Sequence, residues 1–166
     1  MKNLDKDIEK VLIDAVKIQE RVCEMGAQIT KDYEGRELVL VGVLKGAMPF
    51  LCDLMRAIDL PLTIDTMVVS SYGNDTVSSG SIHIRKDLDK EIQGKNVLLL
   101  LATTTTGMTM RRSLECIEYY GGKVQGICSV FSAVKSINGL RVEAMFDTSD
   151  IPGYQAYEVH NCPMCK

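Results

Sequence analysis

The feature that most constrains the fold is an unbroken apolar run at residues 97–101, which leads through a series of threonines into a helical pattern. A continuous apolar run of this length is typical of a strand buried on both faces of a sheet. Apolar side chains then recur at helical spacing, at Met110, Leu114, Ile117 and Tyr120. The order of strand, turn and helix favours anion binding, because backbone N–H groups and the helix dipole point towards the turn.

The turn itself is rich in hydroxyl groups. Threonine side chains supply hydrogen-bond donors, and Gly107 lets the backbone approach a ligand closely. We therefore predict a phosphate-binding turn. The alternative for these residues is an ordinary strand–helix turn in which the threonines cap the helix. The residues expected to bind phosphate are Thr103, Thr104, Thr105, Thr106, Gly107, Met108 and Thr109.

The rest of the chain alternates strand and helix patterns. This alternation predicts an α/β fold with a mainly parallel, doubly wound sheet and helices on both of its faces. We expect a single domain over residues 1–166. The expected elements are a helix over residues 4–33, a strand over 38–43, a helix over 48–58, a strand over 62–69, an edge strand over 81–86, and strands over 124–131 and 142–146.

The overall charge and the apolar pattern exclude two classes of partner. The formal net charge is −3, so no general positive field attracts nucleic acid or an anionic membrane. No apolar run reaches membrane-spanning length, and the first ten residues are too charged for a signal peptide. We therefore expect a cytoplasmic protein that binds neither nucleic acid nor membrane.

The cysteines do not indicate a metal site. Four of the six lie in apolar-patterned segments, where reduced thiols are common. Cys162 and Cys165 form a CPMC pair with His160 beside it, which could be half of a zinc site. The upstream pair that such a site needs is not evident, so no metal ligands are predicted. The sequence ends just after this pair, which suggests a further C-terminal tail.

Three loops are expected to meet at one edge of the sheet, because ligands bind beyond the carboxyl ends of parallel strands. They are residues 44–47, 70–81 and 102–109. Lys45 supplies a cation and Gly46 gives access to the backbone. The second loop is small, polar and long enough to close over a ligand. Together the loops suit a ligand with more than one phosphate group. The alternative is a solvated lysine and a disordered insertion.

The segment VLVGVLKGAMPFLCDLMRAIDLPLTIDTMVVSSYG, with RKDLDKEIQGKNVLLL after it, resembles the bacterial hypoxanthine-guanine phosphoribosyltransferases. The resemblance covers about residues 5–100. It implies the type I phosphoribosyltransferase fold and a role in purine salvage. The implied reaction transfers ribose 5-phosphate from phosphoribosyl pyrophosphate (PRPP) to a purine base, with magnesium, and releases pyrophosphate. The resemblance also implies a homodimer or homotetramer.

The resemblance assigns roles to the three loops. Lys45 and Thr105 are the expected catalytic positions, and residues 105–109 match the part of the family's PRPP motif that holds the 5-phosphate. The pyrophosphate loop of this family often contains a non-proline cis peptide bond. The residues matching that loop are Leu44, Lys45 and Gly46, and those matching the start of the lid are Ser70, Ser71, Tyr72 and Gly73.

The sequence also departs from the family pattern. Leu101 and Ala102 replace two acidic residues that fix the ribose hydroxyls and help to hold magnesium, and Thr105 replaces an aspartate. The family's base-reading lysine has its nearest match in Lys135, two places late. The second half of the chain, with Thr105-Thr106-Gly107 and the segment VQGICSVFSA, resembles the orotate branch of the phosphoribosyltransferases more closely. Purine phosphoribosyl transfer is the expected function. The alternatives are a catalytically impaired nucleotide- or phosphate-binding module with a regulatory role, and an orotate-type transferase.

Overall fold

The computed structural model describes residues 8–69, 84–86, 88–89, 91–105, 108–155, 157 and 163, and it describes the backbone alone for residues 84–86 and 108. The helices in these ranges are α1 (Ala15–Asp32), α2 (Met48–Ala57) and α3 (Met108–Tyr119). The strands are β1 (Leu38–Val43), β2 (Thr63–Val69), β3 (Ile84–Lys86), β4 (Asn96–Thr104), β5 (Lys123–Ser132), β6 (Ser136–Ile137) and β7 (Leu140–Asp147).

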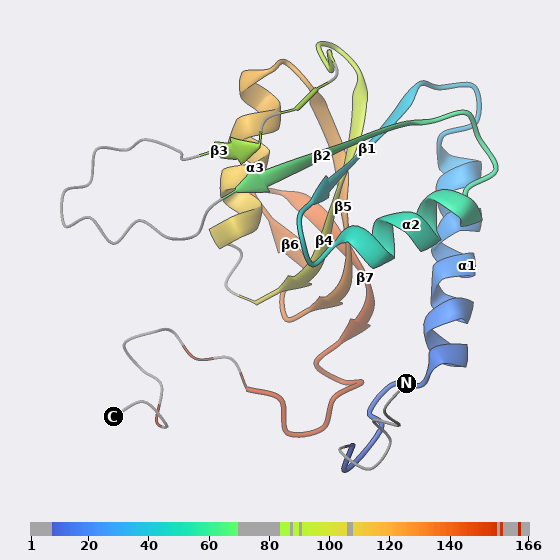
Figure 1. The fold of residues 1–166 in the computed structure, drawn as a ribbon, viewed down its shortest axis with the longest axis vertical. Helices are drawn as coiled ribbons and strands as arrows, with labels where there is room; N and C mark the ends of the chain where they lie inside the picture. The colour runs from blue at the N-terminus through green and yellow to red at the C-terminus, as the bar shows by residue number, and fades with distance from the viewer. Residues whose placement is uncertain are drawn as a thin grey trace, which may run out of the picture.

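The strands form one sheet in the order β3-β2-β1-β4-β5-β7-β6 (Figure 1). Neighbouring strands from β2 to β7 in this order are parallel. The two edge strands, β3 and β6, run antiparallel to their neighbours. The predicted mainly parallel sheet is therefore confirmed, with β1 and β4 at its centre.

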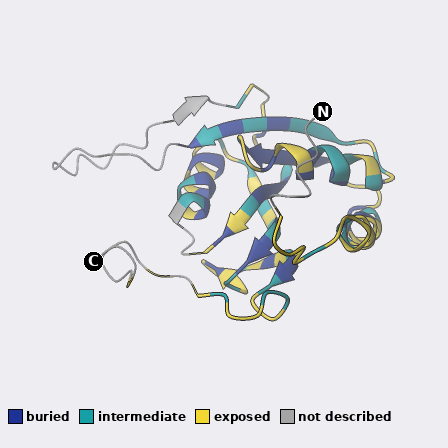
Figure 2. Cartoon of the chain, turned by 60° about the horizontal axis from the view of Figure 1, so that its bottom comes forward, coloured by how far each residue is buried: buried dark blue, intermediate teal, exposed yellow. Residues whose placement is uncertain are grey.

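Helices cover both faces of the sheet, as predicted: α1 and α2 lie on one face and α3 on the other (Figure 1). The side chains of β4 alternate between two cores. Leu99 and Leu101 pack in a cluster with residues of α3, whereas Leu98 and Leu100 pack with residues of α1 and α2. Figure 2 shows the buried residues concentrated along the central strands. This alternation decides which residues near the end of β4 can face a ligand.

The first helix begins later than its apolar pattern predicts. Residues 8–14 are not helical, and α1 begins at Ala15 after Asp14, whose carboxylate accepts a hydrogen bond from Lys17 N at 2.8 Å. Such a cap stabilises a helix start. Three apolar side chains upstream, Ile8, Val11 and Leu12, are exposed, with Val11 at 61%, so they bury little surface that could stabilise a longer helix. Residues 4–7 of the predicted helix lie outside the described ranges.

The central strand is longer than its apolar run. It continues through Thr104 because its ladder with β5 continues, pairing Thr103 with Phe131 and Thr104 with Ser132. The prediction that residues 103 and 104 belong to the turn is therefore wrong. The short strand β6 was not predicted either, and it forms a hairpin with β7. None of the helices described combines the length and the apolar character needed to cross a bilayer.

Candidate functional site at the carboxyl edge of the sheet

The carboxyl ends of β1, β2, β4, β5 and β7 meet at one edge because these strands are parallel. Two of the three predicted loops lie there in contact with each other. A Cβ atom added at Gly46 would come within 3.0 Å of the Cβ of Ala102, so the turn after β1 lies against the end of β4. The third loop, and with it Ser70, Ser71, Tyr72 and Gly73, lies outside the described residues.

Backbone hydrogen bonds fix both loops to the sheet. Leu44 N donates to Met67 O at 2.9 Å, which ties the turn after β1 to β2. Ala133 N donates to Thr104 O at 2.8 Å, which ties the segment after β5 to β4. The site is therefore built on the ends of adjacent strands of a rigid sheet.

The turn at residues 44–47 is suited to an anion. The side chain of Lys45 is exposed, and its ammonium group has no carboxylate partner among the described residues. The backbone N–H groups of Lys45 and Gly46 also have no hydrogen-bond acceptor within those residues. Successive free N–H groups beside a cation form a concavity that attracts negative charge. The peptide bond between Leu44 and Lys45 is cis, as the family resemblance implies.

The threonines differ in position. Thr103 and Thr105 are exposed, whereas Thr104 is 3% exposed and its Oγ1 has no hydrogen-bond partner in the described chain. Thr109 is half-buried in the first turn of α3, where free N–H groups favour an anion. Thr106 and Gly107 lie outside the described residues, and only the backbone of Met108 is described. The structure therefore places Thr105 directly after β4 and Thr109 in the first turn of α3.

The residues that replace the family's acidic pair point in different directions. Leu101 is 4% exposed and packs in the core on the α3 face. Ala102 is half-buried, and its methyl group faces Gly46. Magnesium prefers oxygen ligands, and neither side chain supplies one. Among the described residues no group of three His, Cys, Asp or Glu side chains could hold a metal. These residues do not fit a protein-bound magnesium ion.

An aromatic pair that the sequence did not indicate lies near the end of β5. The ring of Tyr154 packs on that of Phe131 with centroids 4.8 Å apart at an interplanar angle of 62°. The next residue, Ser132, is fixed by hydrogen bonds with Val134: its Oγ donates to the carbonyl at 2.6 Å and accepts from the N–H at 3.2 Å. In the sequence, the only indication of this pair is that Tyr154 follows the last strand. Nothing in the sequence shows that it packs on Phe131.

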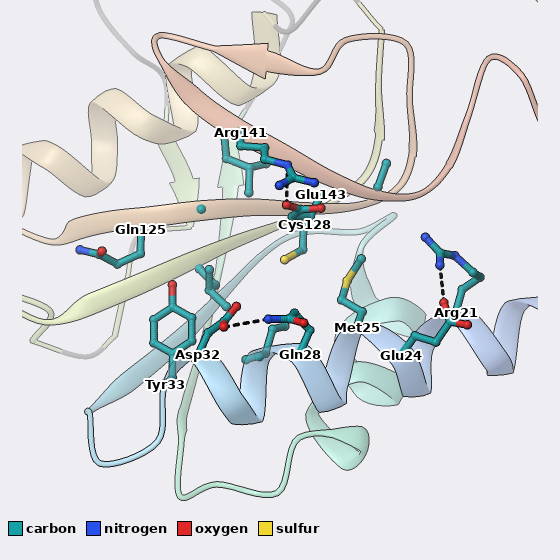
Figure 3. Close-up of a pocket in the computed structure, with 15 residues that line it drawn as sticks. Arg21, Glu24, Met25, Gln28, Asp32, Tyr33, Gln125, Cys128, Arg141 and Glu143 are labelled. Carbon is teal, nitrogen blue, oxygen red and sulfur yellow. Dashed lines mark hydrogen bonds and ion pairs between the residues drawn. The ribbon is translucent and has the colours of Figure 1, made fainter.

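A separate pocket of about 300 Å³ lies between α1 and the strands β5 and β7 (Figure 3). Two basic and three acidic side chains line it, so its charge does not favour an anion. Burial raises the pKa of the Cys128 thiol at this pocket to about 12, which keeps the thiol protonated. The pocket includes no residue of the 44–47 turn or of residues 102–105. It is therefore distinct from the site at the strand ends. The lining residues are Arg21, Glu24, Met25, Gln28, Ile29, Asp32, Tyr33, Leu98, Gln125, Gly126, Ile127, Cys128, Arg141, Glu143 and Ala144.

The expectation of reduced cysteines agrees with the four that the structure describes, none of which forms a disulfide. Cys116 and Cys128 are buried, as their apolar surroundings suggested, but Cys23 is exposed on α1. The expected CPMC pair, Cys162 and Cys165, lies outside the described residues.

Comparison of the sequence with known proteins identifies a family. Residues 13–145 match the family described as the phosphoribosyl transferase domain. A hypoxanthine-guanine phosphoribosyltransferase from Streptococcus thermophilus is 38% identical over 149 residues, which are 90% of this chain and 82% of that protein. The bifunctional protein TilS/HprT of Listeria innocua is 45% identical over 121 residues, and the match spans 73% of this chain and 19% of that protein.

The fold also matches solved structures. A crystal structure of a hypoxanthine phosphoribosyltransferase from Staphylococcus aureus superimposes with a TM-score of 0.78 at 32% identity, covering 93% of this chain and 85% of that one. The similarity of sequence and the similarity of fold therefore indicate the same family. The chain belongs to the phosphoribosyl transferase domain family.

Proposed function

We propose that this chain transfers ribose 5-phosphate from PRPP to a purine base, hypoxanthine or guanine, and releases pyrophosphate as a step of purine salvage. The observation that carries the proposal is the turn at residues 44–47, which has an exposed lysine and two N–H groups without an acceptor among the described residues and lies against the end of β4 in a chain of this family. We also propose a cytoplasmic homodimer or homotetramer, which light scattering after size exclusion can test.

In this reaction the bond from the ribose C1′ to the pyrophosphate oxygen breaks, and a bond from C1′ to a purine nitrogen forms. Negative charge leaves with pyrophosphate while the ribose becomes positively charged. The ammonium group of Lys45 and the N–H groups of Lys45 and Gly46 would bind the leaving group and stabilise its charge. The hydroxyl groups of Thr105 and Thr109 would hold the 5-phosphate and so fix the position of the ribose.

Magnesium is the cofactor that the family resemblance implies, but Leu101 and Ala102 supply no ligand for it. The roles above are therefore assigned without the metal. Thr105 cannot act as a carboxylate base, so any proton leaving the purine needs another acceptor.

These same residues favour a second candidate function, which is nucleotide binding without transfer. Three positions that carry acids in the family are occupied by a leucine, an alanine and a threonine. A regulatory or storage role needs the phosphate contacts but not the acids.

One assay separates the two candidates. The protein is incubated with PRPP, magnesium and hypoxanthine, guanine or orotate in turn, and pyrophosphate release is followed. Transfer predicts release that depends on a purine and falls by about tenfold or more in Lys45→Ala, because a charge-assisted contact is lost. The matched control is Lys123→Ala, an exposed lysine at the start of β5. Release no faster than in a blank without protein would exclude transfer and leave the binding function.

A further inference from the structure

We infer that the site at the carboxyl edge of the sheet binds its phosphate ligand without a protein-bound metal, and that it favours a nucleoside 5′-monophosphate over the magnesium complex of PRPP. The inference deepens the proposed function, because it concerns the same site. It identifies the ligand class that this particular set of residues recognises.

The first step is the direction of the two replacement residues. Position 101 is not available to a ligand, because Leu101 packs among core residues on the α3 face and is 4% exposed. Position 102 is half-buried, and its methyl group lies against the backbone of Gly46. The part of β4 that contacts the anion-binding turn is therefore a hydrocarbon group.

The second step is the charge balance. A magnesium diphosphate is held most readily where carboxylates of the protein balance the charge of the metal. In residues 44–47 and 101–105 the charged group is instead the exposed ammonium of Lys45, which has no acidic partner among the described residues. The carboxylate of Asp147 ends β7 at the same edge, two strands away from β4, and it accepts hydrogen bonds from the backbone N–H and the hydroxyl of Ser149. A cation beside two free N–H groups attracts an uncomplexed phosphate, and a magnesium ion on that phosphate would weaken the attraction.

The third step is the supply of neutral donors. The hydroxyl of Thr105 is exposed at the end of β4, and Thr109 lies in the first turn of α3. Hydroxyl and N–H donors match the oxygens of a phosphate monoester without a metal. The Oγ1 of Thr104, the residue before Thr105, is buried and has no hydrogen-bond partner among the described residues.

The test is titration calorimetry on the full chain, with inosine 5′-monophosphate and PRPP each measured in magnesium chloride and in EDTA. The unmodified protein should bind the monophosphate with dissociation constants that agree within about twofold in the two buffers. PRPP should bind no more tightly than the monophosphate, and magnesium should not tighten it. The inference is overturned if magnesium tightens PRPP binding by about tenfold or more, or if the monophosphate does not bind in either buffer.

Two variants test the cause. Lys45→Ala should weaken monophosphate binding by about tenfold or more in both buffers, since a charge-assisted contact is lost. Lys123→Ala should bind as the unmodified protein does. Ala102→Asp should weaken binding in EDTA by like-charge repulsion and regain it in magnesium. If magnesium has no effect on this variant, position 102 does not face the phosphate and the inference fails.

The calorimetric result can be interpreted whether or not the protein catalyses the transfer reaction. Metal-independent binding without pyrophosphate release would support the inference and reject the transferase proposal. Brisk release together with tight binding of PRPP only in magnesium would do the reverse.

Discussion

Replacing Leu101 by glutamate tests the most consequential feature of the site. By sequence alone, this change restores an acid found in related enzymes. The structure predicts that it destabilises the protein instead, because Leu101 packs in the core on the α3 face. Its neighbour across the ladder, Ser129, is itself buried and its Oγ has no partner among the described residues. A carboxyl group there would find at most one hydroxyl.

The magnitude follows from these contacts. Losing the burial of a leucine side chain costs about 1.5–3 kcal/mol, and burying a poorly paired polar group costs about 1–3 kcal/mol more. The total, about 2.5–6 kcal/mol, is a large part of the stability of an ordinary domain, about 5–15 kcal/mol. The midpoint of urea unfolding should fall by about 1 M or more.

The pH dependence gives a second readout. Burial would raise the pKa of the introduced carboxyl above that of glutamate in the unfolded chain, which is about 4.3. The destabilisation should therefore be smallest below that pH and should grow as the pH rises through the folded-state pKa.

The controls are Leu101→Met, which preserves volume and should cost less than about 1.5 kcal/mol, and Ala102→Asp, which should cost less than about 1 kcal/mol. A loss below about 1 kcal/mol for Leu101→Glu would show that position 101 faces solvent or ligand. The division of roles between positions 101 and 102 would then be wrong.

Three further predictions concern other parts of the chain. Gly46→Val should weaken phosphate binding by calorimetry while leaving the fold intact by circular dichroism, because the new side chain would meet the Cβ of Ala102 at 3.0 Å; unchanged affinity would place the ligand elsewhere. Asp150→Asn should lower stability at neutral pH and not at pH well below about 3.9, the pKa of aspartate in an unfolded chain. A backbone N–H donated to Asp150 lowers the pKa of its carboxyl, so its contribution is present above the unfolded-state pKa and is lost as pH falls through the folded-state pKa; an equal deficit at both pH values would refute this. In labelling with a thiol reagent, exposed Cys23 should react in the folded protein and Cys128 only after unfolding, since burial raises its thiol pKa to about 12; equal rates would contradict the packing of β5.

The central strands were predictable because their signal is local. Residues 38–43 form β1 as the apolar run predicts, and the run at 97–101 lies within β4. A continuous apolar run is required wherever both faces of a strand are covered. The same reasoning failed at residues 8–14, where the apolar spacing is helical but no surface is present to bury Val11.

The contacts that define the site were not predictable in the same way. Only the folded chain brings Gly46 against Ala102 and Tyr154 against Phe131, and neither pair is close in sequence. Successive side chains of β4 point to opposite faces of the sheet, so position 101 faces α3 and position 102 faces the 44–47 turn. The sequence predicts that these two side chains point in opposite directions, but it does not predict which of them faces the ligand. The free N–H groups of the 44–47 turn likewise depend on the geometry of the folded turn. In the sequence, only Gly46 indicates that geometry.

The most direct test of the account is a two-dimensional ¹⁵N–¹H NMR titration of the full chain with PRPP. The account predicts that the largest amide shifts occur at Lys45, Gly46 and Thr105, at the carboxyl edge of the sheet, and that they are strongly reduced in Lys45→Ala. If the largest shifts instead occurred at Tyr33 and Cys128, the phosphate site would lie in the pocket beside α1 and the account would be contradicted.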